Sequence, residues 1–78
     1  MPQIYIYGEV QKPGMLKLER GMTVLQALAA GGGLTPRGTQ RGIRIDRKGP
    51  DGKVQTITPD LQDQLQRDDV VFVRESLF

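Results

Sequence analysis

The sequence predicts an α+β domain in which one short helix packs on one face of a mixed sheet of about five strands. Residues 21–34 combine a helix cap, apolar residues at helical spacing and a run of glycines. Segments of alternating apolar and polar residues, which are typical of strands, lie on both sides of this helix. The most apolar segment, residues 70–73, comes last in the chain, and we expect it to be central in the sheet and buried on both faces.

The N-terminal part of the chain predicts an antiparallel pair of strands. Residues 3–7 alternate, with isoleucines on one side and Tyr5 and Tyr7 on the other. Residues 12–14, Lys-Pro-Gly, have the composition of a type II turn, in which glycine takes a positive φ. Residues 15–18 alternate again and should pair with the first strand.

Residues 24–30 are expected to form the helix. Thr23 can cap its first turn, because the hydroxyl accepts a hydrogen bond from a free backbone N–H group. Apolar residues should share one helix face: Val24, Leu25, Ala27 and Leu28. Gly31 is expected to take the left-handed conformation that ends many helices. A helix this short is not stable alone in water, so it must pack on the strands.

The second half of the chain predicts a hairpin and one further turn. A long polar loop, residues 32–42, should lead into a half-exposed strand at residues 42–48. A Gly-Pro-Asp-Gly turn follows, and the chain should return as a strand at residues 53–58. Residues 59–65 are expected to form a short helical turn, with Thr58 as its cap.

The predicted order of elements is β-β-α-β-β-short helix-β, ending with a strand at residues 69–74. If that strand lies in the middle of the sheet and runs parallel to the first, the chain has a β-grasp fold. A chain of 78 residues is enough for one small domain with a modest core. No apolar run approaches the twenty residues that span a membrane, and the N-terminus has no pattern of a secretory signal.

Composition argues against several kinds of site. The chain has no cysteine and no histidine, so it lacks a thiolate nucleophile, the commonest general base and the commonest metal ligands. Acidic residues on separate elements do not form the convergent carboxylate pair that glycoside hydrolysis needs: Glu9, Glu19, Asp46 and Glu75. We therefore expect no enzyme activity, no metal and no cofactor. The glycines at 31–33 follow the helix, whereas phosphate-binding loops precede one.

Charged residues are unevenly distributed, although the net charge is only +2. One third of the chain is rich in basic residues: Arg37, Arg41, Arg44, Arg47 and Lys48. A later part is rich in acidic residues: Asp60, Asp63, Asp68 and Asp69. Arginines can hold carboxylates or phosphates through two parallel hydrogen bonds, as in recognition of an acidic polysaccharide. They can equally form a solvated surface, or ion pairs with the acidic segment.

Two tyrosines and three arginines are the candidate ligand contacts: Tyr5, Tyr7, Arg37, Arg41 and Arg44. Sugars present C–H faces that stack on aromatic rings, so two tyrosines on one strand face can form a platform for carbohydrate. Alternatively, these rings cover the sheet face opposite the helix or pack on a neighbouring domain. A nucleic acid partner is not expected, because the net charge is low and no known binding module is present.

Four segments carry a resemblance to a known family: GEVQKPG (8–14), GMTVLQALAAGGGLTP (21–36), RGIRIDR (41–47) and DDVVFVRESLF (68–78). In this order and spacing they resemble the soluble-ligand-binding β-grasp (SLBB) domain of bacterial polysaccharide export proteins, which serve capsule and exopolysaccharide secretion. The resemblance covers essentially the whole chain. Where the family usually has a glycine before its final strand, this chain has Asp68.

The resemblance implies that residues 1–78 are one non-catalytic module, a fragment of a larger export protein. Such proteins form rings in the periplasm, below an exit in the outer membrane. The implied partners are other domains of the parent chain, neighbouring protomers and the exported polysaccharide, and the segment itself does not enter the membrane. Two alternatives remain open: a purely structural interaction domain, and a small-ligand-binding domain, since related domains bind a corrinoid cofactor.

Overall fold

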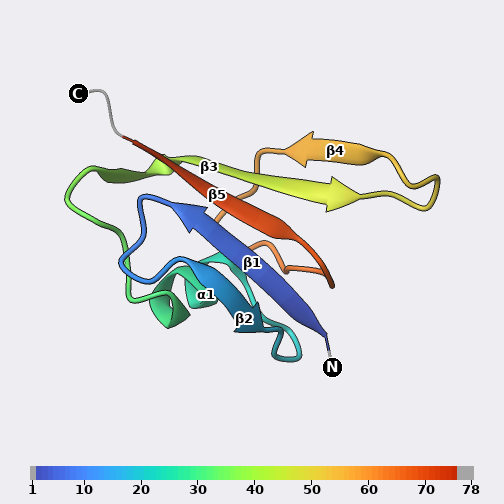
Figure 1. The fold of residues 1–78 in the computed structure, drawn as a ribbon, viewed down its shortest axis with the longest axis horizontal. Helices are drawn as coiled ribbons and strands as arrows, with labels where there is room; N and C mark the ends of the chain where they lie inside the picture. Colours follow the sequence, from blue (N-terminus) through green and yellow to red (C-terminus); the bar gives the residue numbers. More distant parts are fainter. Residues whose placement is uncertain (1, 76–78) are drawn as a thin grey trace.

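The computed structural model describes residues 2–75, except for the side chains of residues 39–41. Within that range the chain forms a mixed five-stranded sheet and one helix, which confirms the predicted α+β class (Figure 1). The elements in chain order are β1 (Gln3–Gly8), β2 (Gly14–Lys17), α1 (Val24–Ala30), β3 (Gly38–Lys48), β4 (Val54–Ile57) and β5 (Val70–Glu75). No helix in this range is long and apolar enough to cross a membrane.

The last strand is central in the sheet, as its apolar sequence predicts. The strand order is β2-β1-β5-β3-β4, so β5 has two strands on each side (Figure 1). β5 runs parallel to β1, with Tyr7 opposite Phe72, and antiparallel to β3, with Arg44 opposite Phe72. β1 and β5 are thus neighbours although they lie at opposite ends of the chain, and their pairing closes the domain.

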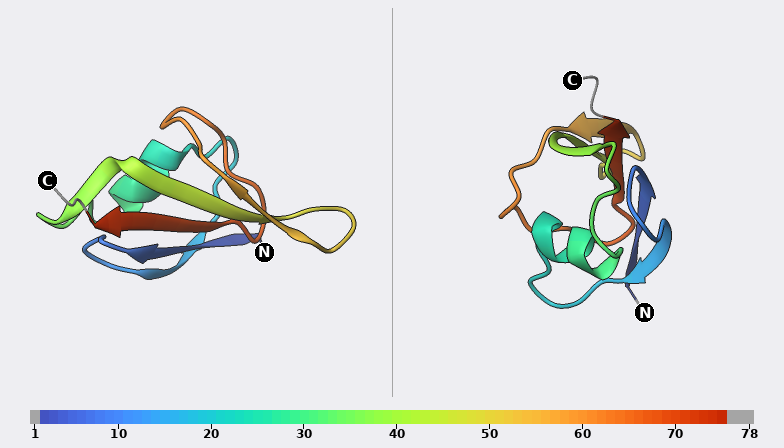
Figure 2. Two further views of the ribbon diagram at one scale, coloured as in Figure 1. Left: turned by 90° about the horizontal axis from the view of Figure 1, so that it is seen from above. Right: turned by 90° about the vertical axis from the view of Figure 1, so that its left-hand side faces the viewer.

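The hydrophobic core lies between the sheet and α1. The sheet curves around the helix, and the connection from β4 to β5 lies on the same side (Figure 2). The sheet contributes fully or almost fully buried side chains from its three central strands: Ile4, Ile6, Ile43, Ile45, Val71 and Val73. The helix contributes Val24, Ala27 and Leu28, which confirms most of the predicted helix face. Leu25 is the exception, since it is 49% exposed.

The start of α1 is closed by a capping box, which confirms Thr23 as the cap. The Thr23 hydroxyl accepts a hydrogen bond from the Gln26 N–H (3.2 Å), and the Gln26 side chain accepts one from the Thr23 N–H (2.9 Å). The left-handed residue at the helix end comes one position later than predicted. Gly31 has φ −81°, and it is Gly32 that adopts the left-handed conformation, with φ +85°.

Residues 59–65, all of which the structure describes, form no helix, contrary to the prediction. A single turn forms, in which the Asp63 N–H donates to the Asp60 carbonyl (3.0 Å). The carbonyls of Leu61 and Asp63 instead accept hydrogen bonds of 3.0 Å from the first two backbone N–H groups of α1. The segment therefore completes the helix that precedes it in the chain, and its carbonyls are not available for a helix of its own.

Two further predictions are corrected on β3 and β5. β3 begins at Gly38, so the loop expected over residues 32–42 is shorter, and the strand has a register shift between Gly38 and Ile43. β5 is not buried on both faces, since Val70 and Phe72 are only half-buried. The described helix covers one face of the sheet. On the other face, the side chains of β5 are flanked only by those of neighbouring strands in the part of the chain that the structure describes.

Candidate functional site

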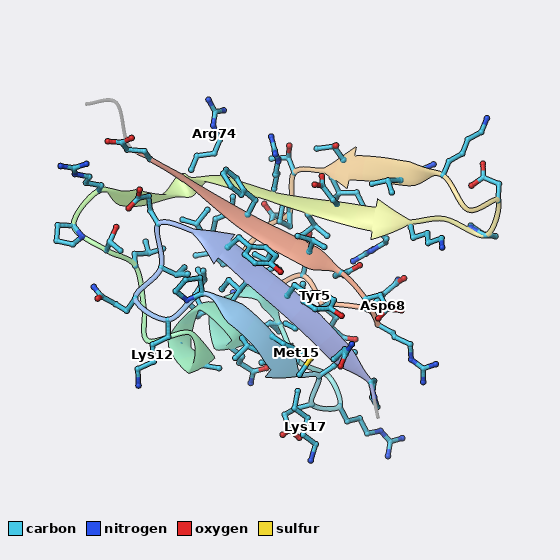
Figure 3. The ribbon with its side chains drawn as sticks, viewed as in Figure 1. Tyr5, Lys12, Met15, Lys17, Asp68 and Arg74 are labelled. Carbon is cyan, nitrogen blue, oxygen red and sulfur yellow. The ribbon has the colours of Figure 1, made fainter. Side chains whose placement is uncertain are left out.

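The sheet face opposite α1, called the outer face below, gathers the chemically distinctive side chains. It is defined by the residues that alternate with the core residues on each strand: Gln3, Tyr5, Tyr7, Met15, Lys17, Arg44, Asp46, Thr56, Val70, Phe72 and Arg74. Side chains on this face include Tyr5, Met15 and Lys17, as Figure 3 shows. Its composition is mixed, because aromatic, aliphatic, hydroxyl and charged groups lie side by side.

Aromatic rings form a row across the middle of the outer face. The rings of Tyr5 and Tyr7 are nearly parallel, at 2°, with centroids 6.5 Å apart. Tyr5 is half-buried, and its hydroxyl accepts a hydrogen bond from the Gln3 side-chain amide (2.7 Å). Tyr7 is 44% exposed and lies opposite Phe72 in the β1–β5 ladder. The row therefore presents accessible ring surface on two adjacent strands.

Arg44 extends this row onto a third strand. Its guanidinium carbon lies 4.7 Å from the centroid of the Phe72 ring, which is the geometry of a cation–π contact. Arg44 lies directly opposite Phe72 in the β3–β5 ladder, so the contact follows from strand register. The stacking uses the flat face of the guanidinium, whereas its N–H donors lie in the plane of the group and can point toward a ligand.

An open groove of about 380 Å³ begins where the aromatic row ends. It is lined by Gly42, Ile43, Arg44, Thr56, Thr58 and Arg74. Gly42, on β3, contributes no side chain to this lining. Two arginines and two threonines are therefore among the residues that line one open space on the sheet surface, and Figure 3 shows the Arg74 side chain projecting from the sheet.

The candidate residues named from sequence fall in different places. Tyr5, Tyr7 and Arg44 share the outer face. Arg37 does not: it lies just before β3, its side chain is 76% exposed, and its nearest described acid is Glu75, at 3.9 Å. Arg41 belongs to β3, but its side chain lies outside the part of the chain that the structure describes.

Arg47 is paired within the fold and belongs to the inner face of the sheet. Its guanidinium donates to both oxygens of Asp69, at 3.0 and 2.9 Å. The Asp69 carboxylate is fully buried and also accepts a hydrogen bond from the Gln66 N–H (2.8 Å). The hydrogen bond to Asp69 raises the pKa of Arg47 above its ordinary value. This basic residue therefore pairs with the acidic segment, which was one of the alternatives for the basic cluster.

Sequence reasoning missed four residues of this surface: Thr56, Thr58, Phe72 and Arg74. The alternation of β5 identifies Phe72 and Arg74, because Val71 and Val73 point into the core while these two side chains point outward. The apolar run at residues 70–73 hides this alternation. The threonines are found only once the register of β4 on β3 is known.

Two other kinds of site find no support in the described residues. No group of three or more acidic, histidine or cysteine side chains there is arranged to hold a metal ion. The N–H groups of Gly31, Gly32 and Gly33 donate to carbonyls of α1, at 2.9, 3.1 and 2.8 Å, so these glycines end the helix and do not form a phosphate cradle.

Comparison with known families gives a match over most of the chain. The SLBB domain family matches residues 3–58, which extend from β1 to just beyond β4. A comparison with curated proteins gave no match. SLBB domains are found in polysaccharide export proteins and are not known to be catalytic. Since the match covers well over half of the residues, the chain belongs to the SLBB domain family.

Proposed function

We propose that this chain is a non-catalytic β-grasp module of a periplasmic polysaccharide export protein, associated with an outer-membrane exit. In that role its outer face makes weak contacts with the exported polysaccharide. The central position of β5 and its parallel pairing with β1 support the β-grasp arrangement. The family supports the export context.

The observation that carries the sugar contact is the row of rings on the outer face. Tyr5 and Tyr7 have parallel ring planes, and Phe72 lies on the adjacent strand. Flat rings with one accessible side stack on the C–H faces of pyranoses without selecting one linkage. A neighbouring guanidinium, from Arg44, adds hydrogen-bond donors for hydroxyl or carboxylate oxygens.

The open shape of this surface fits transport better than retention. A polymer that moves along a conduit must leave each contact quickly, so individual contacts must be weak and numerous. The groove is open, and the rings lie on a sheet surface instead of in an enclosed cavity. A ring of protomers would repeat this surface, so that a polymer could make many weak contacts at once.

Ring assembly is the second part of the proposal. β2 and β4 are the two edge strands of the described sheet, and each is only four residues long. Their outward backbone groups have no partner strand within the described sheet, which makes them available to another domain or protomer. Sedimentation at increasing concentration tests self-association of the chain. A species that stays monomeric at every concentration leaves the sugar contact as the only supported role of this chain.

The sugar contact is tested by titration of the ¹⁵N-labelled chain with cellohexaose, a neutral oligosaccharide, and with hexagalacturonate, an acidic one. We expect amide shift changes at Tyr5, Tyr7 and Phe72 with a dissociation constant in the millimolar range. Tyr7→Ala should weaken binding of both sugars, because it removes an exposed ring. Leu25→Ala is the matched control, since it truncates an exposed apolar side chain on the helix.

The titration separates the proposal from a purely structural role. Absence of localised shifts with either sugar at millimolar concentration contradicts sugar contact and favours a domain that only binds other proteins. Shifts that gather around α1 instead of the outer face also contradict it. An equal loss of binding in Leu25→Ala and Tyr7→Ala also contradicts sugar contact through the outer face, because Leu25 lies on the helix, on the other side of the sheet.

A further inference from the structure

The groove beside the aromatic row is lined by two arginines that form no ion pair with the described acidic residues. Arg44 and Arg74 both line it, and neither forms an ion pair with an acidic side chain in the part of the chain that the structure describes. Arg47, three residues after Arg44 on the same strand, shows the contrast, because it holds Asp69 through two hydrogen bonds. Two arginines without an acidic partner among the described residues therefore line one space.

The hydroxyl groups in the groove complement these charges. Thr56 and Thr58 come from β4 and the segment that follows it, opposite the arginines. The Thr56 hydroxyl donates to Asp46 at 3.2 Å, so its lone pairs remain available as acceptors. Guanidinium donors and hydroxyl acceptors together match a carboxylate that is attached to a hydroxyl-rich ring.

We infer that this groove is a carboxylate subsite that gives the outer face a preference for polysaccharides containing uronic acids. The inference rests on the proposed function and adds the class of polymer. Arg44 connects the two parts of the surface, because it stacks on Phe72 and also lines the groove. One sugar can stack on the rings while the carboxylate of the same or the next sugar accepts hydrogen bonds from Arg44 and Arg74.

The local charge favours a single carboxylate over a dense polyanion. Asp46 lies beside the groove, hydrogen-bonded to Thr56, so Arg44, Arg74 and Asp46 together leave one positive charge, which matches one carboxylate. The net charge of the chain is +2, which is small for a nucleic acid partner. Aromatic rings beside arginine also fit single-stranded nucleic acid, so that class is included in the test as a competing outcome.

The test compares hexagalacturonate with its methyl ester, which has the same backbone and rings without the charges. Amide shifts of the chain at about 0.15 M salt give both dissociation constants. We expect the acid to bind about three- to tenfold tighter than the ester, the range that partly exposed arginine–carboxylate contacts provide. Higher salt should weaken binding of the acid and leave the ester unchanged.

Arg74→Gln should reduce binding of the acid to the level of the ester, and Arg74→Lys should restore only part of the loss, because lysine lacks the fork geometry. Arg20→Gln is the matched control. It removes an exposed positive charge after β2, at the opposite edge of the sheet, and should leave both sugars unchanged.

The outcomes separate this inference from the proposed function. Equal binding of acid and ester on the outer face overturns the inference and leaves the proposed function standing. Failure of both to shift the outer face overturns both. Unchanged acid binding in Arg74→Gln, or equal losses in Arg74→Gln and Arg20→Gln, overturns the groove as the subsite. Tighter binding of oligothymidylate than of hexagalacturonate at the same salt concentration overturns it in favour of nucleic acid.

Discussion

The two faces of the sheet differ in how far their side chains are buried. On the inner face, Ile4, Ile6, Val71 and Val73 are completely buried beneath α1 and the segment before β5. On the outer face, Tyr7 and Met15 are 44% and 62% exposed, and Phe72 is only half-buried. Adjacent residues of one strand therefore have different roles, since successive side chains point to opposite faces. The inner face stabilises the domain, whereas the outer face is available to partners.

Charged residues repeat this contrast. Arg47 points inward and is held by a fully buried carboxylate, while Arg44, three residues earlier, points outward and stacks on a ring. Whether a basic residue of β3 forms an ion pair within the fold or faces outward therefore depends on which face of the sheet its side chain points to. The predictions below test that difference, from the largest expected effect to the smallest.

The largest loss is expected where β1 meets β5, because both faces depend on this pairing. Gly8 has φ +94°, and a Cβ atom there would overlap the backbone carbonyl of Val73. We expect Gly8→Ala to reduce the free energy of unfolding by about 4 kcal/mol or more, measured by urea denaturation. The free energy of unfolding of the whole chain is expected to be about 4–12 kcal/mol, so a large fraction of the Gly8→Ala molecules should be unfolded.

Gly52→Ala separates steric overlap from backbone strain. Gly52 also has a positive φ, of +80°, but a Cβ atom added there would have no other atom within 4 Å. We expect Gly52→Ala to lower the free energy of unfolding by about 1 kcal/mol, because only the left-handed conformation disfavours alanine there. Similar losses at the two positions would mean that the contact with Val73 is not what makes Gly8 necessary.

The adjacent pair Ile6 and Tyr7 tests the two faces directly. Ile6 is fully buried, so Ile6→Ala should lower the free energy of unfolding by about 3–4 kcal/mol through lost burial and a cavity. Tyr7→Ala should cost less than about 1 kcal/mol, because the ring is partly solvated. Thermal unfolding should show a midpoint lowered by about 12 °C or more for the first variant. A comparable loss for Tyr7→Ala would contradict a solvent-accessible outer face.

The ion pair on the inner face should be the next most sensitive element. Asp69→Asn leaves the guanidinium of Arg47 without its carboxylate, and we expect a loss of about 2–3 kcal/mol, less than for a pair buried on both sides. Asp46→Asn, on the outer face, should cost less than about 0.5 kcal/mol. A double-mutant cycle of Asp69→Asn with Arg47→Gln measures the coupling. A coupling near zero would show that the two side chains do not act as a pair.

The smallest effect is expected at the contact of Arg44 with Phe72. Arg44→Gln removes the cation–π attraction and should lower the free energy of unfolding by about 0.5–1 kcal/mol. Phe72→Leu should reduce the effect of Arg44→Gln, because leucine has no ring for the guanidinium. An Arg44→Gln loss above about 2 kcal/mol would indicate that this arginine supports the fold, which would weaken its assignment to the ligand surface.

Local patterns are enough to predict most elements of this chain. The cap at Thr23, the apolar spacing after it and the alternation of the strands are all properties of neighbouring residues. The cap, the helix and the five strands appear where these patterns predict them, except that Leu25 is exposed and β3 begins earlier. Asp68 is a similar case. It stands where the family usually has a glycine, and its φ of +65° is the left-handed conformation that aspartate tolerates better than most residues.

Predictions failed where a segment depends on a distant partner. Residues 59–65 have the composition of a helical turn, but their carbonyls bond to the start of α1, more than thirty residues earlier. Likewise, the arginines of the basic cluster could not be sorted from sequence, because the role of Arg47 depends on the position of Asp69 and that of Arg44 on the position of Phe72. Such pairings are set by strand order.

The sequence by itself therefore determined the class of the domain, the cap and face of its helix, and the central position of its final strand. Periodicity, turn composition and the apolar run at residues 70–73 are sufficient for these, because each pattern is carried by residues close together in the chain. Only the tertiary structure decided which arginine is paired with a buried carboxylate, which rings are accessible and where a groove opens. These depend on the register between β5, β3 and β4, which brings together side chains from segments that are far apart in sequence.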